Sequence, residues 1–253
     1  MKNVKRDAKM MLVVDIGNTN INFGLFRGKK LESRFIIPAQ DYSRNELKER
    51  AGGIKIDNAV VCSVVPKATA AVAGDLRILS GKRPLVIGED LIVPVKNLYR
   101  TPELVGQDRL VNAYAGIILY GTPLIVVDFG TAVTFDVVSK KGEYLGGMIL
   151  PGLRISLDAL VCKTALLPDI QLGKPREFIG RDTRNSMLSG LVYGFAALTD
   201  DLAGRIKRDI GAGARVVVTG GDAAFLSAYC DTAIALDKDL TLKGLYLLGS
   251  RPL

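Results

Sequence analysis

The chain has 253 residues, of which 48% are hydrophobic and 24% charged, and it carries a formal net charge of +8. A chain of this kind can bury a substantial core, as one large domain or two small ones. No apolar run approaches the roughly 20 residues of a membrane-spanning helix, so we expect no membrane partner. Histidine is absent, which excludes Ser-His-Asp triads, histidine bases and nearly all catalytic zinc sites.

Part of the positive charge lies in residues 1–10, which read MKNVKRDAKM. The apolar run behind it is too short for a signal peptide. We therefore predict a disordered basic leader there, or alternatively an upstream start, with Met10 or Met11 as the other possible start. An excess of positive charge suits nucleic acid or a small anionic ligand. No basic stripe interleaved with aromatic residues supports the first alternative, so we expect no nucleic-acid partner. The three cysteines are far apart and form no CxxC, which predicts reduced thiols in a cytoplasmic protein.

The first predicted element is a β-hairpin over residues 11–26, which read MLVVDIGNTNINFGLF. A buried strand ends at Asp15, a glycine turn follows, and an apolar–polar alternation then resumes, as in a half-buried strand. The tip of this hairpin offers backbone N–H groups, an amide and a hydroxyl beside one acid. Such a tip can hold a phosphate and a hydrated cation.

The remaining first half predicts strands and helices in alternation, which is typical of an α/β fold. The loop over residues 97–110 ends in Gly106-Gln107-Asp108-Arg109 and leads into a helix over residues 110–120. Asp108 and Arg109 near a helix start either bind an anion or form a simple cap with a surface arginine. The other expected elements are strands over 31–37, 58–65, 85–87 and 91–95 and helices over 41–51 and 67–79.

The second half opens with an echo of the first hairpin. Residues 124–136 read LIVVDFGTAVTFD, so that Val126-Val127-Asp128-x-Gly130 repeats Val13-Val14-Asp15-x-Gly17. One copy alone would be a capped structural hairpin. Two copies predict two similar half-domains that face each other over a cleft, with a boundary near residues 120–122.

Later segments of the second half leave alternatives open. The glycines of EYLGGMILPGL, residues 143–153, allow close backbone approach or only loop geometry. A long helix after Asp182 carries Gly190 and Gly194, and its apolar stripe serves the core or a partner helix. The turn Thr219-Gly220-Gly221 after a strand over 215–219 suits a nucleotide. The other expected elements are a helix over 155–160, a strand over 233–236 and a helix over 240–248.

Other nucleotide-binding patterns are absent from the sequence. There is no GxxxxGK[ST], and the glycines at 211 and 213 do not continue into GxGxxG. The kinase motif HRD cannot occur without histidine. The two hairpins are therefore the remaining candidates for phosphate binding.

Taken together, the motifs resemble those of the type III pantothenate kinases. These are the two hairpin tips, Gly106-x-Asp108-Arg109, Gly146-Gly147-x-Ile149-x-Pro151-Gly152 and Thr219-Gly220-Gly221, in family order from residue 11 onward. The resemblance implies two ribonuclease H-like (actin-like ATPase) half-domains over 11–120 and 121–253, with mixed sheets flanked by helices. It also implies ATP-dependent phosphorylation of pantothenate to 4'-phosphopantothenate, the first step of coenzyme A biosynthesis, in a homodimer.

The same resemblance implies roles for individual residues. Asp108 would be the catalytic base, Asp15 would manage Mg²⁺ through water, and Asp128 would bind a monovalent cation, K⁺ or NH₄⁺. The ATP contacts would be Asp15, Ile16, Gly17, Asn18, Thr19, Asn20, Ile21, Asn22, Thr131, Thr219, Gly220 and Gly221. The pantothenate contacts would be Tyr99, Gly106, Gln107, Asp108, Arg109 and Thr183. Arg109 would pair with the pantothenate carboxylate or with a transferring phosphate.

Two other functions remain as alternatives to this kinase. The chain could be a binding or regulatory protein without turnover, or a kinase for another hydroxyl acceptor. Both hairpin acids and Asp108 are present, which argues against the first. The Gly-x-Asp-Arg loop argues against the second.

Overall fold

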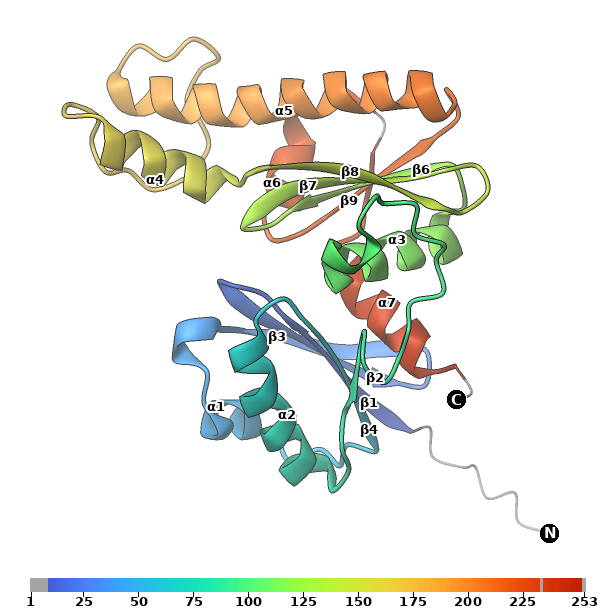
Figure 1. Ribbon diagram of the computed structural model, residues 1–253. Coiled ribbons are helices and arrows are strands. Elements are labelled where there is room, and N and C mark those ends of the chain that lie inside the picture. Colours follow the sequence, from blue (N-terminus) through green and yellow to red (C-terminus); the bar gives the residue numbers. More distant parts are fainter. Residues whose placement is uncertain (1–8, 233, 252–253) are drawn as a thin grey trace. The chain divides into compact units, whose positions relative to one another are not determined.

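The computed structural model describes residues 9–232 and 234–251 and contains two mixed five-stranded sheets with helices around them (Figure 1). The predicted α/β class is confirmed. Residues 1–8 of the predicted leader lie outside the described residues. The predicted end of the leader at residue 10 is wrong, because the first strand already begins at Met10. Within the described part of the chain, no helix is long and apolar enough to cross a membrane.

The chain divides into two compact units. The first comprises the described residues up to Pro94, Leu104–Ala115 and the C-terminal segment from Thr241, and the second comprises Val95–Glu103 and Gly116–Leu240. This division differs from a single boundary near residue 120. The C-terminal helix belongs to the first unit by its contacts, and the segment before the Gly106 loop belongs to the second.

The first unit contains a sheet of order β3-β2-β1-β4-β5. Strand β1 pairs antiparallel with β2 and parallel with β4, as expected for a hairpin followed by a crossover. Its elements are β1 (Met10–Ile16), β2 (Asn20–Arg27), β3 (Lys30–Pro38), α1 (Arg44–Arg50), β4 (Asn58–Ser63), α2 (Pro66–Ser80), β5 (Leu85–Val86) and α7 (Leu240–Gly249).

The side chains of β1 alternate between the two faces of this sheet. Leu12, Val14 and Ile16 pack in one core cluster with residues of α1 and α2. The opposite face packs on α7, where Phe26 stacks on Tyr246 at 4.5 Å between ring centroids. Asp15 has the parity of this second face, and it is therefore directed away from α1 and α2.

The second unit contains a sheet with the same plan, in the order β8-β7-β6-β9-β10. Its core cluster joins alternate residues of β6 and β9 to residues of α4, α5 and α6. The elements of this half are α3 (Gln107–Tyr120), whose first part belongs to the first unit, β6 (Leu124–Phe129), β7 (Ala132–Val138), β8 (Tyr144–Pro151), α4 (Leu153–Lys163), α5 (Thr183–Ile210), β9 (Arg215–Thr219), α6 (Ala223–Leu226) and β10 (Ile234–Leu236).

Three expected elements differ from the structure. Residues 91–95 form no strand, and Leu91 makes only an isolated bridge to Ile87. The glycine-rich segment over 143–153 is largely strand β8. Its glycines are accommodated in an edge strand whose pairing with β7 shifts register beside Gly146. Helix α3 begins at Gln107, three residues earlier than predicted, so that Asp108 lies in its first turn.

Candidate active site

In the first unit, Asp15 stands at the end of β1 between two neighbouring strands. It lies opposite Asn22 of β2 and opposite Cys62 of β4 in the ladder. The Asn22 side-chain amide donates to Asp15 Oδ2 at 3.1 Å. The turn beyond is closed by the Gly17 N–H, which donates to the carbonyl of Asn20 at 3.0 Å. The strand end therefore presents one oriented carboxylate beside a tight turn.

Asp108 is held by the loop that precedes α3. The Arg109 N–H donates to Asp108 Oδ1 at 2.9 Å and to the Gly106 carbonyl at 3.1 Å. A Cβ on Gly106 would lie 2.5 Å from Asp108 Oδ1, so a larger residue here would force the Asp108 carboxylate to move. Arg109 is buried, and the Gln107 side chain lies against Gly88.

Asp15 and Asp108 lie close enough for the negative charge of Asp108 to act on the Asp15 carboxylate. Burial and then the negative charge of Asp108 raise the pKa of Asp15 to about 7, and the hydrogen bond from Asn22 opposes this shift. Burial also raises the pKa of Asp108, against the N–H group and charge of Arg109. Burial and these same two acids raise the pKa of the Cys62 thiol. A cation bound here would relieve the repulsion between the two acids.

The raised pKa of Asp15 predicts how stability changes with pH. Asp15 binds its proton more tightly in the folded chain, at about 7, than at its ordinary 3.8, so its stabilising effect is complete below pH 3.8 and is lost as the pH rises towards 7. We expect Asp15 to lower the free energy of unfolding across this window by on the order of 2 kcal/mol, after allowance for solvent screening. Urea denaturation at a series of pH values would measure this, and Asp15→Asn should have the flatter curve. Parallel curves for the two proteins would contradict the prediction.

In the second unit, Asp128 occupies the position in β6 that Asp15 occupies in β1. A Cβ on Gly130 would lie 3.3 Å from Asp128 Oδ1, so the carboxylate folds back over its own turn. Gly220 has a φ of +98° and also touches Asp128 and the carbonyl of Phe129. The hairpin tip and the Thr219–Gly221 turn are thus in direct contact.

The end of β8 closes on the same tip. The Gly152 N–H donates to the carbonyl of Thr131 at 3.1 Å, and a Cβ on Gly152 would collide with the carbonyls of Gly130 and Thr131. The motif over residues 143–153 therefore allows close backbone approach at Gly152. Gly130 and Gly220 lie against the Asp128 carboxylate, and Thr131 follows Gly130 directly in the chain. Backbone groups and a hydroxyl near one acid suit a small site for a phosphate and a cation.

The donor atoms present suit a metal ion that keeps water or substrate ligands. The described residues contain no group of three or more His, Cys, Asp or Glu side chains placed to hold a metal. Mg²⁺ commonly binds through one or two carboxylates together with waters and phosphate oxygens. Asp15 can supply one carboxylate to such a site. A metal held by protein side chains alone would need a ligand group that the described residues do not form.

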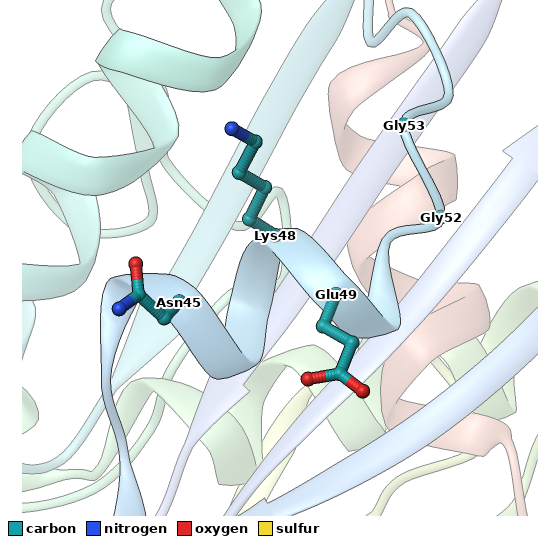
Figure 2. A pocket seen from close by; sticks show the side chains of 5 residues that line it. All are labelled: Asn45, Lys48, Glu49, Gly52 and Gly53. Atoms are coloured by element: carbon teal, nitrogen blue, oxygen red, sulfur yellow. The ribbon is translucent and has the colours of Figure 1, made fainter.

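Two hollows in the first unit contain none of the predicted site residues. One, of about 390 Å³, is a surface depression at the end of α1, lined by Asn45, Lys48, Glu49, Gly52 and Gly53 (Figure 2). The other, of about 410 Å³, is lined by residues of α2 and β5 and by Ser63 at the end of β4.

Comparison with known proteins decides which family these motifs belong to. The family model described as type III pantothenate kinase matches residues 11–205. A type III pantothenate kinase of Geobacter sulfurreducens is 40% identical, with 96% of this chain and 99% of the relative covered. One of Persephonella marina is 38% identical, with coverage of 94% and 97%. This chain belongs to the type III pantothenate kinase family.

Solved structures support the fold. A conserved putative Baf family transcriptional activator from Campylobacter jejuni has a TM-score of 0.61 at 24% identity and covers 94% of this chain and 96% of its own. Component A of the (R)-2-hydroxyglutaryl-CoA dehydratase of Acidaminococcus fermentans has a TM-score of 0.53 at 12% identity, with coverage of 95% and 96%. These likenesses concern the fold alone.

The structure distributes the residues predicted for this kinase family between the two units. The first unit brings together Asp15, Asn22 and Asp108, and it also contains Gly106–Arg109. In the predicted ATP loop, Asn18, Thr19 and Asn20 are exposed, whereas Ile16 and Ile21 lie in the core and can offer only backbone groups. In the second unit, Asp128 lies against Gly220, and Thr131 lies against Gly152 at the end of β8. Tyr99 lies against Gly146 of β8, and Thr183 is the exposed first residue of α5, after the capping residue Asp182.

Some neighbours of these acids were missing from the sequence-based prediction. Cys62 adjoins Asp15 only through the register of β1 with β4, which the sequence does not specify. Gly88 has a φ of +88° and makes room for Gln107. The glycine itself was the only sequence signal for that contact.

Proposed function

We propose that the Asp15–Asp108 pair of the first unit is the centre of the kinase reaction of this chain, the ATP-dependent phosphorylation of the terminal hydroxyl of pantothenate. The observation that carries the proposal is the placement of two carboxylates in one unit, one at the end of β1 and one in the first turn of α3, close enough for the charge of Asp108 to act on Asp15. Its relatives are named type III pantothenate kinases at 38–40% identity over nearly their whole length.

Asp108 acts as the base in this proposal. Phosphoryl transfer passes through a loose transition state, so the base orients the hydroxyl and accepts its proton late in the transfer. Burial raises the pKa of Asp108, which makes it a better proton acceptor than a solvated aspartate. The Arg109 N–H fixes one carboxylate oxygen, and Gly106 leaves the space for that arrangement. The Arg109 side chain is assigned to a substrate anion, the carboxylate or a phosphate.

Asp15 would hold Mg²⁺ through water, and Asn22 fixes the orientation of its carboxylate. Bound Mg²⁺ would neutralise charge on the phosphates as the phosphoryl group moves. The exposed residues Asn18, Thr19 and Asn20 and the turn amides would donate to ATP oxygens. In the second unit, Thr131 would donate to phosphate, and Thr219–Gly221 would lie near the adenosine.

Asp128 would bind the monovalent cation, K⁺ or NH₄⁺. Its carboxylate lies against Gly130 and Gly220 and beside the carbonyl of Phe129. Carboxylate and carbonyl oxygens are suitable ligands for a hard cation. A cation there would supply part of the positive charge that P-loop enzymes obtain from a lysine.

A coupled assay of ADP release tests the reaction and the cation together. We expect turnover with pantothenate and none above background with a panel of sugars and other small alcohols. Turnover should require K⁺ or NH₄⁺, because Na⁺ is smaller and holds its water more tightly. Activity with a sugar in place of pantothenate would overturn the assigned acceptor. Equal rates in sodium-only buffer would remove the cation role of Asp128.

We also propose that the chain works as a homodimer in the cytoplasm. Gly190 and Gly194 lie exposed on the 28-residue helix α5, with no other atoms within 4 Å of where their Cβ would stand. That slim face can accommodate a helix of a second copy. The three cysteines are free thiols, which suits a reducing compartment. A native mass twice the 27.2 kDa of the chain would support the dimer.

A further inference from the structure

A buried pair of polar side chains anchors the beginning of β8. Tyr144, the first residue of β8, is fully buried, and its hydroxyl donates to Asp136 Oδ1 at 2.8 Å. Asp136 lies on β7 and is also fully buried, and its Oδ2 accepts from the Thr134 hydroxyl at 3.1 Å. A buried carboxylate is costly unless it is hydrogen-bonded. The pair therefore fixes the Tyr144 ring with a directional bond in addition to packing.

The backbone of Tyr144 in turn holds a segment that belongs to no named strand. The Tyr144 N–H donates to the carbonyl of Lys96 at 2.9 Å, and the Leu98 N–H donates to the carbonyl of Tyr144 at 2.9 Å. Asn97 thus forms a parallel bridge with Tyr144. The Lys96 ammonium also contacts Glu143 Oε1 at 2.7 Å. Residues 96–98 therefore cover the outer edge of β8 at the point where the buried pair fixes it.

Tyr99 follows directly on this segment. Its N–H donates to the Asn97 side chain at 2.9 Å, and the Asn97 amide donates to the carbonyl of Pro102 at 3.2 Å. The Tyr99 ring lies against Gly146, where a Cβ would come within 3.3 Å of it. Gly146 has a φ of +119° and lies at a register shift between β7 and β8. Such irregularities re-aim neighbouring groups, and here the shift leaves room for an aromatic ring.

We propose that Asp136 and Tyr144 are positioning residues for Tyr99, acting through the backbone of Tyr144 and residues 96–98. The inference rests on the proposed function, and it takes Tyr99 as one of the pantothenate contacts that the resemblance to the type III pantothenate kinases implies. A phenylalanine at 144 would fill the same volume but would have no hydroxyl to hold the strand end. The Tyr144 N–H, which donates to the Lys96 carbonyl, and the Tyr144 carbonyl, which accepts from the Leu98 N–H, would then be less precisely placed.

The test compares two tyrosines that each bond an aspartate within the second unit. Tyr144→Phe removes the bond to Asp136, and the matched control Tyr120→Phe removes the 2.9 Å bond from Tyr120 to the buried Asp237. We expect Tyr144→Phe to raise KM for pantothenate about tenfold, the equivalent of roughly one hydrogen bond, while kcat and KM for ATP stay within about twofold. The control should leave all three constants within about twofold. A merely structural role would not separate the two KM values.

A second measurement needs no substrate. The chain contains no tryptophan, so Leu98→Trp, at an exposed position, would give a single fluorescent reporter on the segment. Acrylamide quenching of this reporter should increase when Tyr144→Phe is added and should not change with Tyr120→Phe. Should Tyr144→Phe fail to fold, Gly146→Ala keeps both side chains of the buried pair but strains the backbone at a φ of +119° and crowds the Tyr99 ring. It should then give the same selective rise in KM for pantothenate.

The outcomes separate this inference from the proposed function. Unchanged quenching in Tyr144→Phe overturns the inference. Increased quenching with an unchanged KM for pantothenate also overturns it, because the pair would then order a segment that positions nothing for the substrate. Failure of the unmodified protein to phosphorylate pantothenate overturns the proposed function instead, and the positioning of a pantothenate residue fails with it, although quenching still reports whether the pair orders residues 96–98.

Discussion

Asp108→Asn is expected to reduce kcat about a thousandfold, the middle of the range for loss of a general base, while ATP binds nearly as well as before. Asparagine keeps an oxygen that can accept from the Arg109 N–H, the 2.9 Å bond that orders the start of α3. The change therefore removes the proton acceptor and leaves the local fold. Steady-state turnover and calorimetric titration with ATP would measure the two quantities separately.

The same substitution should alter Asp15. The negative charge of Asp108 is the second cause of the raised pKa of Asp15, so its removal should move that pKa down from about 7. Asp90→Asn is the matched control, because Asp90 also accepts from a backbone N–H of the first unit, that of Val86 at 2.9 Å. We expect the control to change kcat less than about twofold, as for most substitutions outside a site. Turnover of Asp108→Asn within tenfold of the unmodified protein would remove Asp108 as the base.

Local patterns were sufficient to predict much of the fold. The alternation after Asp15 and the match between residues 13–17 and 126–130 predicted two hairpins, and both sheets contain them with equivalent acids. The matching parity explains this success, because the apolar residues on either side of each acid determine which face it takes. The ends of elements were less accurate, as at Met10, whose N–H donates to Asp57 Oδ2 at 2.8 Å, and at Gln107, whose side chain lies against Gly88.

The features that could not be predicted depend on the register between strands and on where the C-terminal helix packs. Cys62 adjoins Asp15 because β4 pairs with β1 in one particular register, and a shift of one residue would have placed it on the other face. The C-terminal helix packs on the first sheet, where Gly249 makes room for Val60 and Met11. Small side chains of this kind are compatible with many partners. The glycines of residues 143–153 likewise could not show that one of them supports the Tyr99 ring.

The second large effect is expected from Gly220, in the turn after β9. Its φ of +98° disfavours any residue with a Cβ, at a cost of about 1–3 kcal/mol. A Cβ would also stand 2.6 Å from the carbonyl carbon and oxygen of Phe129, and it would collide with Asp128 Oδ1. Backbone atoms on a central strand cannot move aside cheaply, so the turn itself must shift.

We therefore expect Gly220→Ala to lower the melting temperature and to raise KM for ATP at least about a hundredfold, since an overpacking cost of about 3 kcal/mol corresponds to that factor. Dependence on K⁺ should weaken as well, because Asp128 is displaced. Gly213→Ala is the control, since a Cβ there meets nothing within 4 Å and its φ is unremarkable for an alanine. Gly221 is equally open, so an alanine there should be milder than at Gly220, although both glycines belong to one motif. If Gly220→Ala binds ATP as tightly as Gly213→Ala does, the contact between this turn and the Asp128 hairpin has no part in nucleotide binding.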